Sequence, residues 1–229
     1  MPLPLEEITR RADALYSERE EKQNVRLSLE LLRASPAPHD YEVLWRLGRA
    51  LFFLGQEAQR VEDARRYHAQ GAQASERAAR LAPERVEGHF WLGVNLALLA
   101  RLENPLRALR HAVSARRALE RAASIDPTHH AAGPLRVMGR LQHKLPRLVG
   151  GGTPRARASF ERAIELAPAN TVTRLYFAEL LLETGALDQA RTQLEAILKA
   201  PHDAAWAFEI KRDQRLAREL LKEVSKQML

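Results

Sequence analysis

The chain has 229 residues, a formal net charge of +7 and no cysteine. This length is sufficient for one domain with a continuous core, and the lack of cysteine excludes disulfide bridges, thiol nucleophiles and zinc–thiolate sites. Ala, Leu, Arg and Glu dominate, which favours helices, and the sequence shows neither strand alternation nor an Asn-Gly hairpin turn.

A sequence pattern typical of helices recurs along the chain, and each copy ends at a proline. The copies end at Pro83, Pro127, Pro168 and Pro201, after a degraded first copy that ends near 36. Each clear copy also carries an earlier small residue, as in tetratricopeptide repeats, where it lets two helices approach closely. We therefore predict an all-α fold: an α-solenoid of about four to five tetratricopeptide-like helical hairpins with a C-terminal capping helix.

In chain order, we expect a single helical-repeat domain over residues 1–229. Its repeats are expected at 5–36, 40–83, 86–127, 131–168 and 171–201, and its capping helix at 204–229. Helix starts are marked by Asp40, by Asn104-Pro105 and by Thr153-Pro154, because such residues cap a helix or suit its first turn.

In the tetratricopeptide register, certain positions of each first helix line a concave groove. The candidate partner groove comprises Trp45, Arg49, Phe52, Phe53, Phe90, Val94, Arg136, Arg140, His143 and Lys144. Residues 101–147 contain ten basic and only three acidic residues. We expect an acidic protein or peptide as partner, since arginine forms bidentate contacts with carboxylates. The alternative is that these arginines only keep the helices solvated.

Signals for catalysis, cofactors, metals or nucleic acid are weak. His129 and His130 fall in an expected turn, and the glycines at 150–152 lack the spacing of a phosphate-binding loop. We predict no catalytic, cofactor or metal site, and no nucleic-acid partner, because aromatic residues do not interleave with the basic cluster. The charged N-terminus predicts neither signal peptide nor membrane span, hence a cytoplasmic location, or a periplasmic one if a leader had been removed.

Successive blocks of the sequence resemble the TatT component family of TRAP transporters. The blocks are ADALYSERE, YEVLWRLGRALFF, EGHFWLGVNLAL, LPRLVGGGTPRARASFERAIELAP and AWAFEIKRDQRLARELL, in matching order from about Ile8 to Leu221. The chain is more distantly similar to the regulator-of-microtubule-dynamics family through LWRLGRA and the long middle helices. It departs from TatT proteins in having no lipobox cysteine.

The TatT resemblance implies a non-enzymatic repeat protein that associates with the solute-binding protein of a transporter. It also implies a hydrophobic or organic-acid ligand, and it leaves room for a homo-oligomer. Two hypotheses follow. Either the chain is a protein-interaction scaffold with a partly basic groove, or it is a ligand-binding accessory in which Phe52, Phe53, Phe90 and Leu98 line an apolar channel.

Overall fold

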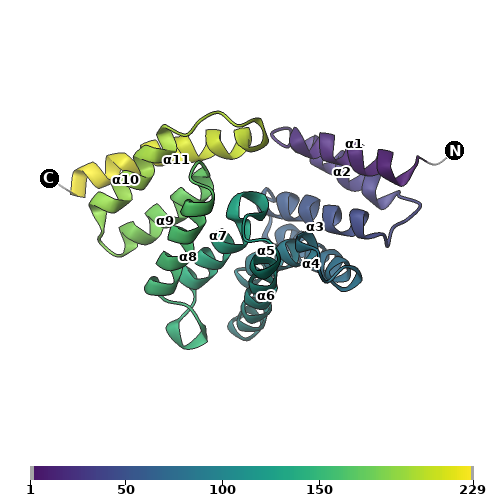
Figure 1. The fold of residues 1–229 in the computed structure, drawn as a ribbon, viewed down its shortest axis with the longest axis horizontal. Coiled ribbons are helices and arrows are strands. Elements are labelled where there is room, and N and C mark those ends of the chain that lie inside the picture. Colours follow the sequence, from purple (N-terminus) through teal and green to yellow (C-terminus); the bar gives the residue numbers. More distant parts are fainter. Residues whose placement is uncertain (1–2, 228–229) are drawn as a thin grey trace. The chain divides into compact units, whose positions relative to one another are not determined.

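The computed structural model describes residues 3–227, and within this range it contains eleven α-helices, two short 3-10 helices and no strand (Figure 1). The α-helices are α1 Leu5–Ser17, α2 Lys22–Arg33, α3 Tyr41–Gln56, α4 Val61–Leu81, α5 Val86–Ala100, α6 Pro105–Ile125, α7 His129–Lys144, α8 Thr153–Leu166, α9 Thr171–Glu183, α10 Leu187–Leu198 and α11 Ala207–Gln227. The 3-10 helices are η1 Arg147–Val149 and η2 Ala204–Trp206. The predicted all-α, solenoid-like fold is confirmed.

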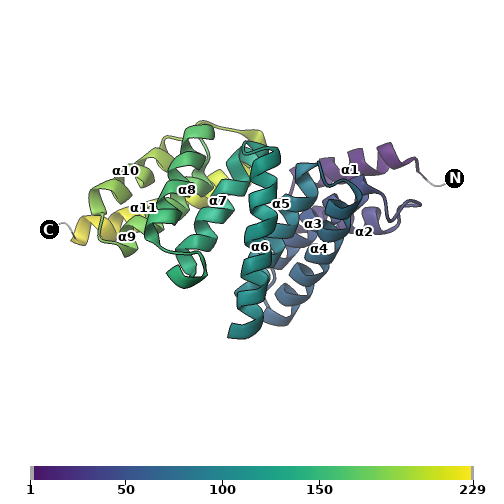
Figure 2. The ribbon, with the colours of Figure 1, turned by 60° about the horizontal axis from the view of Figure 1, so that its bottom comes forward.

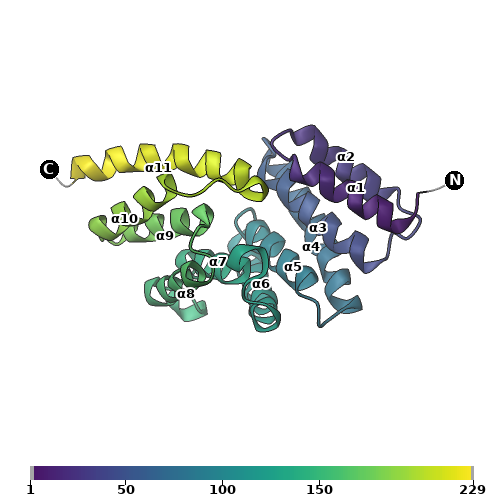
Figure 3. The ribbon, with the colours of Figure 1, turned by 45° about the horizontal axis from the view of Figure 1, so that its top comes forward.

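The helices form two compact units, Met1–Pro127 and Thr128–Leu229. Unit 1 holds the hairpins α1/α2, α3/α4 and α5/α6, and unit 2 holds α7/α8, α9/α10 and the final helix α11 (Figure 2). In each unit a helix packs mainly on its neighbours in sequence, as in a repeat stack. Figure 3 shows α11 running beside α10 and α9, which it contacts. The single domain over 1–229 stays a prediction.

The observed N-termini of the helices show which of the predicted capping residues act as caps. The Asp40 carboxylate accepts a hydrogen bond from the backbone N–H of the second residue of α3, and the Asn104 side chain caps α6 in the same way. Both predicted caps are confirmed. Thr153 as a cap is wrong, because α8 already begins there and Gly152 precedes it as N-cap with φ +109°. Glycine reaches this φ without the clash that a Cβ would cause.

Close approach between helices depends on residues without a side chain. A Cβ at Gly88 of α5 would lie 2.6 Å from the backbone nitrogen of Ala79 in α4. At Gly139 of α7 it would lie 2.8 Å from the Phe160 ring of α8. Gly139 is one of the small repeat residues in the sequence pattern, and this geometry explains why it is small.

The first turn of α7 is left-handed. His130, Ala131 and Ala132 have φ of 52°, 54° and 56°, although none is glycine. This conformation costs an L-residue about 1–2 kcal/mol. The Arg136 guanidinium compensates by donating to the carbonyl oxygens of His130 at 3.2 Å and Ala131 at 2.8 Å. The Trp206 ring also packs edge-on against His130, with centroids 4.8 Å apart. These contacts hold the turn in place.

Candidate functional site

The six predicted groove residues of unit 1 divide between core and surface. Phe53, Phe90 and Val94 are buried, Phe90 with only 1% exposure. Phe90 packs on Trp91 with ring centroids 4.8 Å apart, so it belongs to the core of the hairpin stack. In the folded unit these three side chains are out of reach of a partner. Trp45, Arg49 and Phe52 are half-buried and remain reachable.

Arg49 is held in a fixed position by its neighbours. Its guanidinium pairs with Asp13 of α1 at 2.5 Å and lies 4.1 Å from the centroid of the Tyr16 ring. Arg46, one turn earlier, pairs with the same carboxylate at 2.8 Å. Burial alone would raise the pKa of Asp13, but the two guanidinium groups outweigh burial and lower it. The positive charge of Arg49 is therefore already compensated.

A second carboxylate extends this chain of charges from α3 to α5. Glu42 accepts hydrogen bonds from Arg46 at 2.6 Å, from the Trp45 indole at 2.9 Å and from Arg85. Burial alone would raise the pKa of Glu42, but these donors lower it to about 2. Arg85 also forms an ion pair with Glu87, at 2.8 Å. We call the set Asp13, Glu42, Arg46, Arg49, Arg85 and Glu87 the unit 1 ion network.

In unit 2 the predicted groove residue Arg136 is buried, with 5% exposure. Besides the two turn carbonyls, its guanidinium approaches the Asn170 side-chain oxygen at 3.4 Å. Burial lowers its pKa to about 10. The guanidinium is thus engaged inside the folded unit, where it supports the left-handed turn.

The other basic groove residues of unit 2 face acidic residues of α9. Arg140 pairs with Glu179, and His143 and Lys144 both contact Glu183, at 2.7 and 2.6 Å. Burial lowers the pKa of His143 although Glu183 opposes this shift. Sequence reasoning missed both glutamates, because they come from the next repeat. The basic patch that the sequence suggested is largely neutralised.

Unpaired positive charge lies instead on α6. Arg110 and Arg117 have no acidic partner within residues 3–227, whereas their neighbours Arg107, Arg116 and Arg121 pair with glutamates. Leu106 and Leu109 precede them on the same helix, with exposures of 63% and 39%. Spacings of three, four and seven residues place these four side chains on one face. We call Leu106, Leu109, Arg110 and Arg117 the α6 stripe. The helical spacing was a signal available in the sequence.

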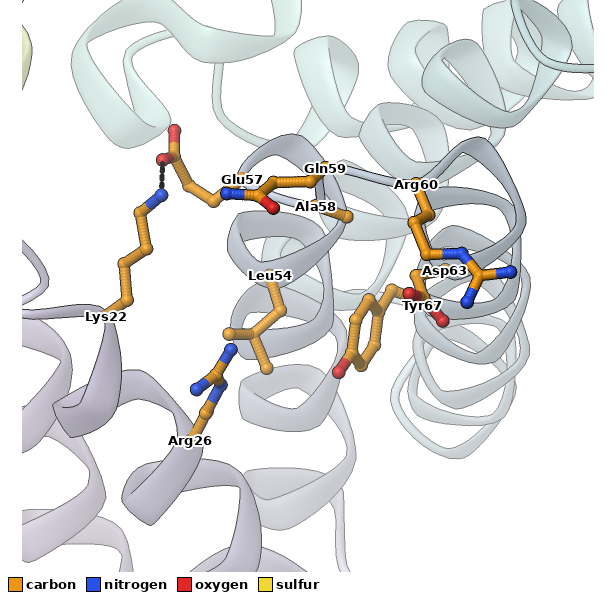
Figure 4. A pocket seen from close by; sticks show the side chains of 9 residues that line it. All are labelled: Lys22, Arg26, Leu54, Glu57, Ala58, Gln59, Arg60, Asp63 and Tyr67. Carbon is orange, nitrogen blue, oxygen red and sulfur yellow. Dashed lines mark ion pairs between the residues drawn. The ribbon is translucent and has the colours of Figure 1, made fainter.

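A cavity of about 320 Å³ lies in unit 1 between α2, the end of α3 and the start of α4 (Figure 4). None of the predicted site residues lines it. Its main side chains are those of Lys22, Arg26, Leu54, Glu57, Asp63 and Tyr67. They come from three helices and from the connection between α3 and α4, without a shared motif, so no local pattern pointed to them.

Two further properties concern residues 3–227 only. This part of the chain has no cluster of three or more His, Asp or Glu residues that could hold a metal ion. No helix in the same range combines the length and apolar character that crossing a membrane requires.

Comparisons with known proteins place this geometry in context. The family model described as "Regulator of microtubule dynamics protein 1-3" matches residues 8–145, and a tetratricopeptide-repeat model matches residues 153–208. The crystal structure of a thermophilic tetratricopeptide-repeat protein from Thermus thermophilus aligns with a TM-score of 0.68 at 22% identity, over 91% of this chain and 98% of that one. This identity supports a shared fold alone.

A de novo designed helical repeat protein aligns over 96% of this chain and 94% of its own at 18% identity, but its TM-score of 0.18 is too low to indicate a shared arrangement. No curated protein sequence matches the chain.

Proposed function

The chain belongs to the regulator of microtubule dynamics protein 1-3 family, and we propose that it is a non-enzymatic tetratricopeptide-repeat scaffold for another protein. The observation that carries this proposal is the stack of helical hairpins in both units. Stacked repeats of this kind expose extended surfaces that suit a protein partner better than a small substrate. The TatT-specific context stays a prediction.

We further propose that the partner is acidic. The chain carries a net charge of +7, and the α6 stripe presents Arg110 and Arg117, neither of which has an acidic partner in the described part of the chain. Two further candidate contacts are the reachable groove residues Trp45 and Arg49 of unit 1 and, separately, Lys144 of unit 2, and both Arg49 and Lys144 are paired with a carboxylate. A partner at the stripe needs only acidic residues, whereas a partner at the groove has to compete with built-in carboxylates.

Capture by the tagged full chain, at low and at high salt, tests the proposal. The family name associates its members with microtubules, so polymerised tubulin is one purified bait and native cell extract is the other. The stripe variant is Arg110→Glu with Arg117→Glu, and the groove variant is Lys144→Glu. Arg77→Glu is the matched control, because Arg77 is exposed on α4 and has no ion pair among the described residues.

Salt-sensitive capture that is lost in the stripe variant and kept in the control supports the α6 stripe, since exposed charge contacts are screened by salt. Loss in the Lys144→Glu variant alone supports the groove. Capture that all three variants retain at every salt concentration contradicts the acidic-partner proposal.

The second candidate is a ligand-binding accessory of a TRAP-type transporter, for which the sequence resemblance is the support. Two residues of its expected apolar channel, Phe53 and Phe90, are in the core of unit 1, while Phe52 and Leu98 are half-buried. A solute-binding protein among the specifically captured proteins would favour this role. A hydrophobic or organic acid released from the native protein in mass spectrometry would add to that support.

A further inference from the structure

The cavity between α2, α3 and α4 has the features of a small anion site. We propose that it binds a carboxylate group carried on a short apolar body. This site is distinct from the groove and from the α6 stripe, and it goes beyond the scaffold role. Three features support it: which lining groups are already paired, where the unpaired donors lie, and the net charge of the lining.

The two acidic side chains of the cavity are already neutralised. Glu57 pairs with Lys22 at 2.8 Å, and Asp63 pairs with Arg66 at 2.8 Å. In contrast, the Arg26 guanidinium and the Tyr67 hydroxyl have no hydrogen-bond partner among residues 3–227. The cavity therefore offers two unused donors, while each of its carboxylates is already paired with a cation, so it favours a ligand that brings hydrogen-bond acceptors.

The unused donors flank an apolar floor. Figure 4 shows the Arg26 guanidinium and the Tyr67 hydroxyl on either side of Leu54, whose side chain is buried. A carboxylate above Leu54 would accept a charge-assisted hydrogen bond from the guanidinium and a neutral one from the phenol. The Leu54 side chain and the Tyr67 ring would then contact the apolar body that carries the carboxylate.

The charge of the lining favours a single negative charge. Lys22, Arg26 and Arg60 provide three positive charges, and Glu57 and Asp63 provide two negative ones. A monoanionic carboxylate neutralises the difference, whereas a phosphate dianion would add repulsion from both acids. The volume of about 320 Å³ is at the small end of ligand pockets, which start at roughly 300 Å³. The carboxylate can belong to a free acid or to an acidic side chain of a partner.

The test is a titration of the ¹⁵N-labelled full chain, followed by ¹H–¹⁵N correlation spectra. The probes are 3-phenylpropanoate, its neutral amide 3-phenylpropanamide, and the capped dipeptide acetyl-Glu-Phe-amide. We expect saturable shifts of amides in residues 22–26 and 54–67 with the free acid, the dipeptide or both, and no such shifts with the neutral amide. Shifts with the free acid alone indicate that the site binds a small molecule. Shifts with the dipeptide alone indicate that it binds an acidic side chain of a partner protein.

Variants then assign the donors. Arg26→Gln should weaken binding of the responding probe about tenfold, and Tyr67→Phe about threefold, because each loses one donor to the carboxylate. Arg77→Gln, an exposed arginine outside the cavity, should bind unchanged. All three positions are at least partly exposed, and equal melting temperatures confirm that the variants fold. No shifts with any probe, equal shifts with the neutral amide, or unchanged binding by Arg26→Gln would overturn the proposal.

Discussion

The ion network of unit 1 and the polar groups around Arg136 and Asp213 in unit 2 lie at different depths. In unit 1, the carboxylates of the ion network are partly exposed, Glu42 by 34%, and the pairs run along the first helices of three hairpins. In unit 2, Arg136 is 5% exposed and Asp213 is fully buried, where it accepts hydrogen bonds from Thr171 and Arg212 at 2.7 Å each. These residues come from α7, α9 and α11.

This difference in depth decides what the charges do. Exposed ion pairs contribute about 0–1 kcal/mol each, so the unit 1 network mainly orients the side chains of a surface. Buried polar groups contribute little when complete, but they cost several kcal/mol when one member is removed. Charged residues therefore shape a surface in the unit 1 ion network, whereas Arg136 and Asp213 hold helices together in unit 2.

The largest expected effect is in unit 2. Arg136→Met leaves the carbonyls of the left-handed turn without their donor, and it should lower the free energy of unfolding by about 3 kcal/mol. Arg140→Met is the matched control. Because Arg140 is partly exposed, this substitution should lower the free energy of unfolding by about 1 kcal/mol or less. Denaturant titration measures both, and hydrogen exchange should locate the loss in α7–α11. If both variants lost the same free energy of unfolding, the buried Arg136 would contribute no more to stability than the partly exposed Arg140.

The close helix contacts of the two units should also differ in cost. Gly88→Ala in unit 1 places a Cβ 2.6 Å from a backbone nitrogen, and we expect a loss of about 2 kcal/mol because backbone yields little. Gly139→Ala in unit 2 meets the Phe160 ring, a side chain that is able to shift, so about 1 kcal/mol is expected. The order of the two melting temperatures is the measurement, and the reverse order would contradict this account.

The unit 1 network predicts a dependence of stability on pH. The folded state lowers the pKa of Glu42 from 4.5 to about 2, so its stabilising effect is present above pH 4.5 and is lost as the pH falls toward 2. Because Glu42 is one-third exposed, we expect Glu42→Gln to cost only about 1 kcal/mol at pH 7. Unfolding curves of both proteins should converge between pH 4.5 and 2. A constant difference over this range would show that Glu42 titrates normally.

The smallest expected effect is an increase, not a decrease, in the free energy of unfolding. Ala131→Gly should raise the free energy of unfolding by roughly 0.5–1 kcal/mol, because glycine tolerates the left-handed φ of 54°. Ala158→Gly, at an exposed position inside α8 of the same unit, should lower it by about 1 kcal/mol. Thermal unfolding compares the two. Destabilisation by both substitutions would mean that the turn at Ala131 is right-handed.

Features that depend on residues close to one another in the sequence could be predicted from the sequence alone. Prolines and small residues predicted the helical repeats, and Asp40 and Asn104 act as caps within their own turns. The left-handed turn had no local signal, since Ala131 and Ala132 are ordinary helix formers and the stabilising contacts come from Arg136 and Trp206.

The candidate site depended on more distant partners. The positive charge at Lys144 looked available because its counter-charge, Glu183, is supplied by the following repeat. Phe53, Phe90 and Val94 looked like groove residues, but the rotation of each helix about its axis turns them into the core. Helix rotation depends on packing across the hairpin, which the spacing within one repeat does not determine.

Packing between sequence neighbours also has a consequence for how the chain reaches its native state. Each helix contacts mainly the helices that precede and follow it, so most loops that have to close during folding are short. Short loop closures carry a small entropic barrier, and chains rich in such contacts fold on the order of milliseconds or faster. Any hairpin is then able to nucleate folding, and structure spreads from it to its neighbours.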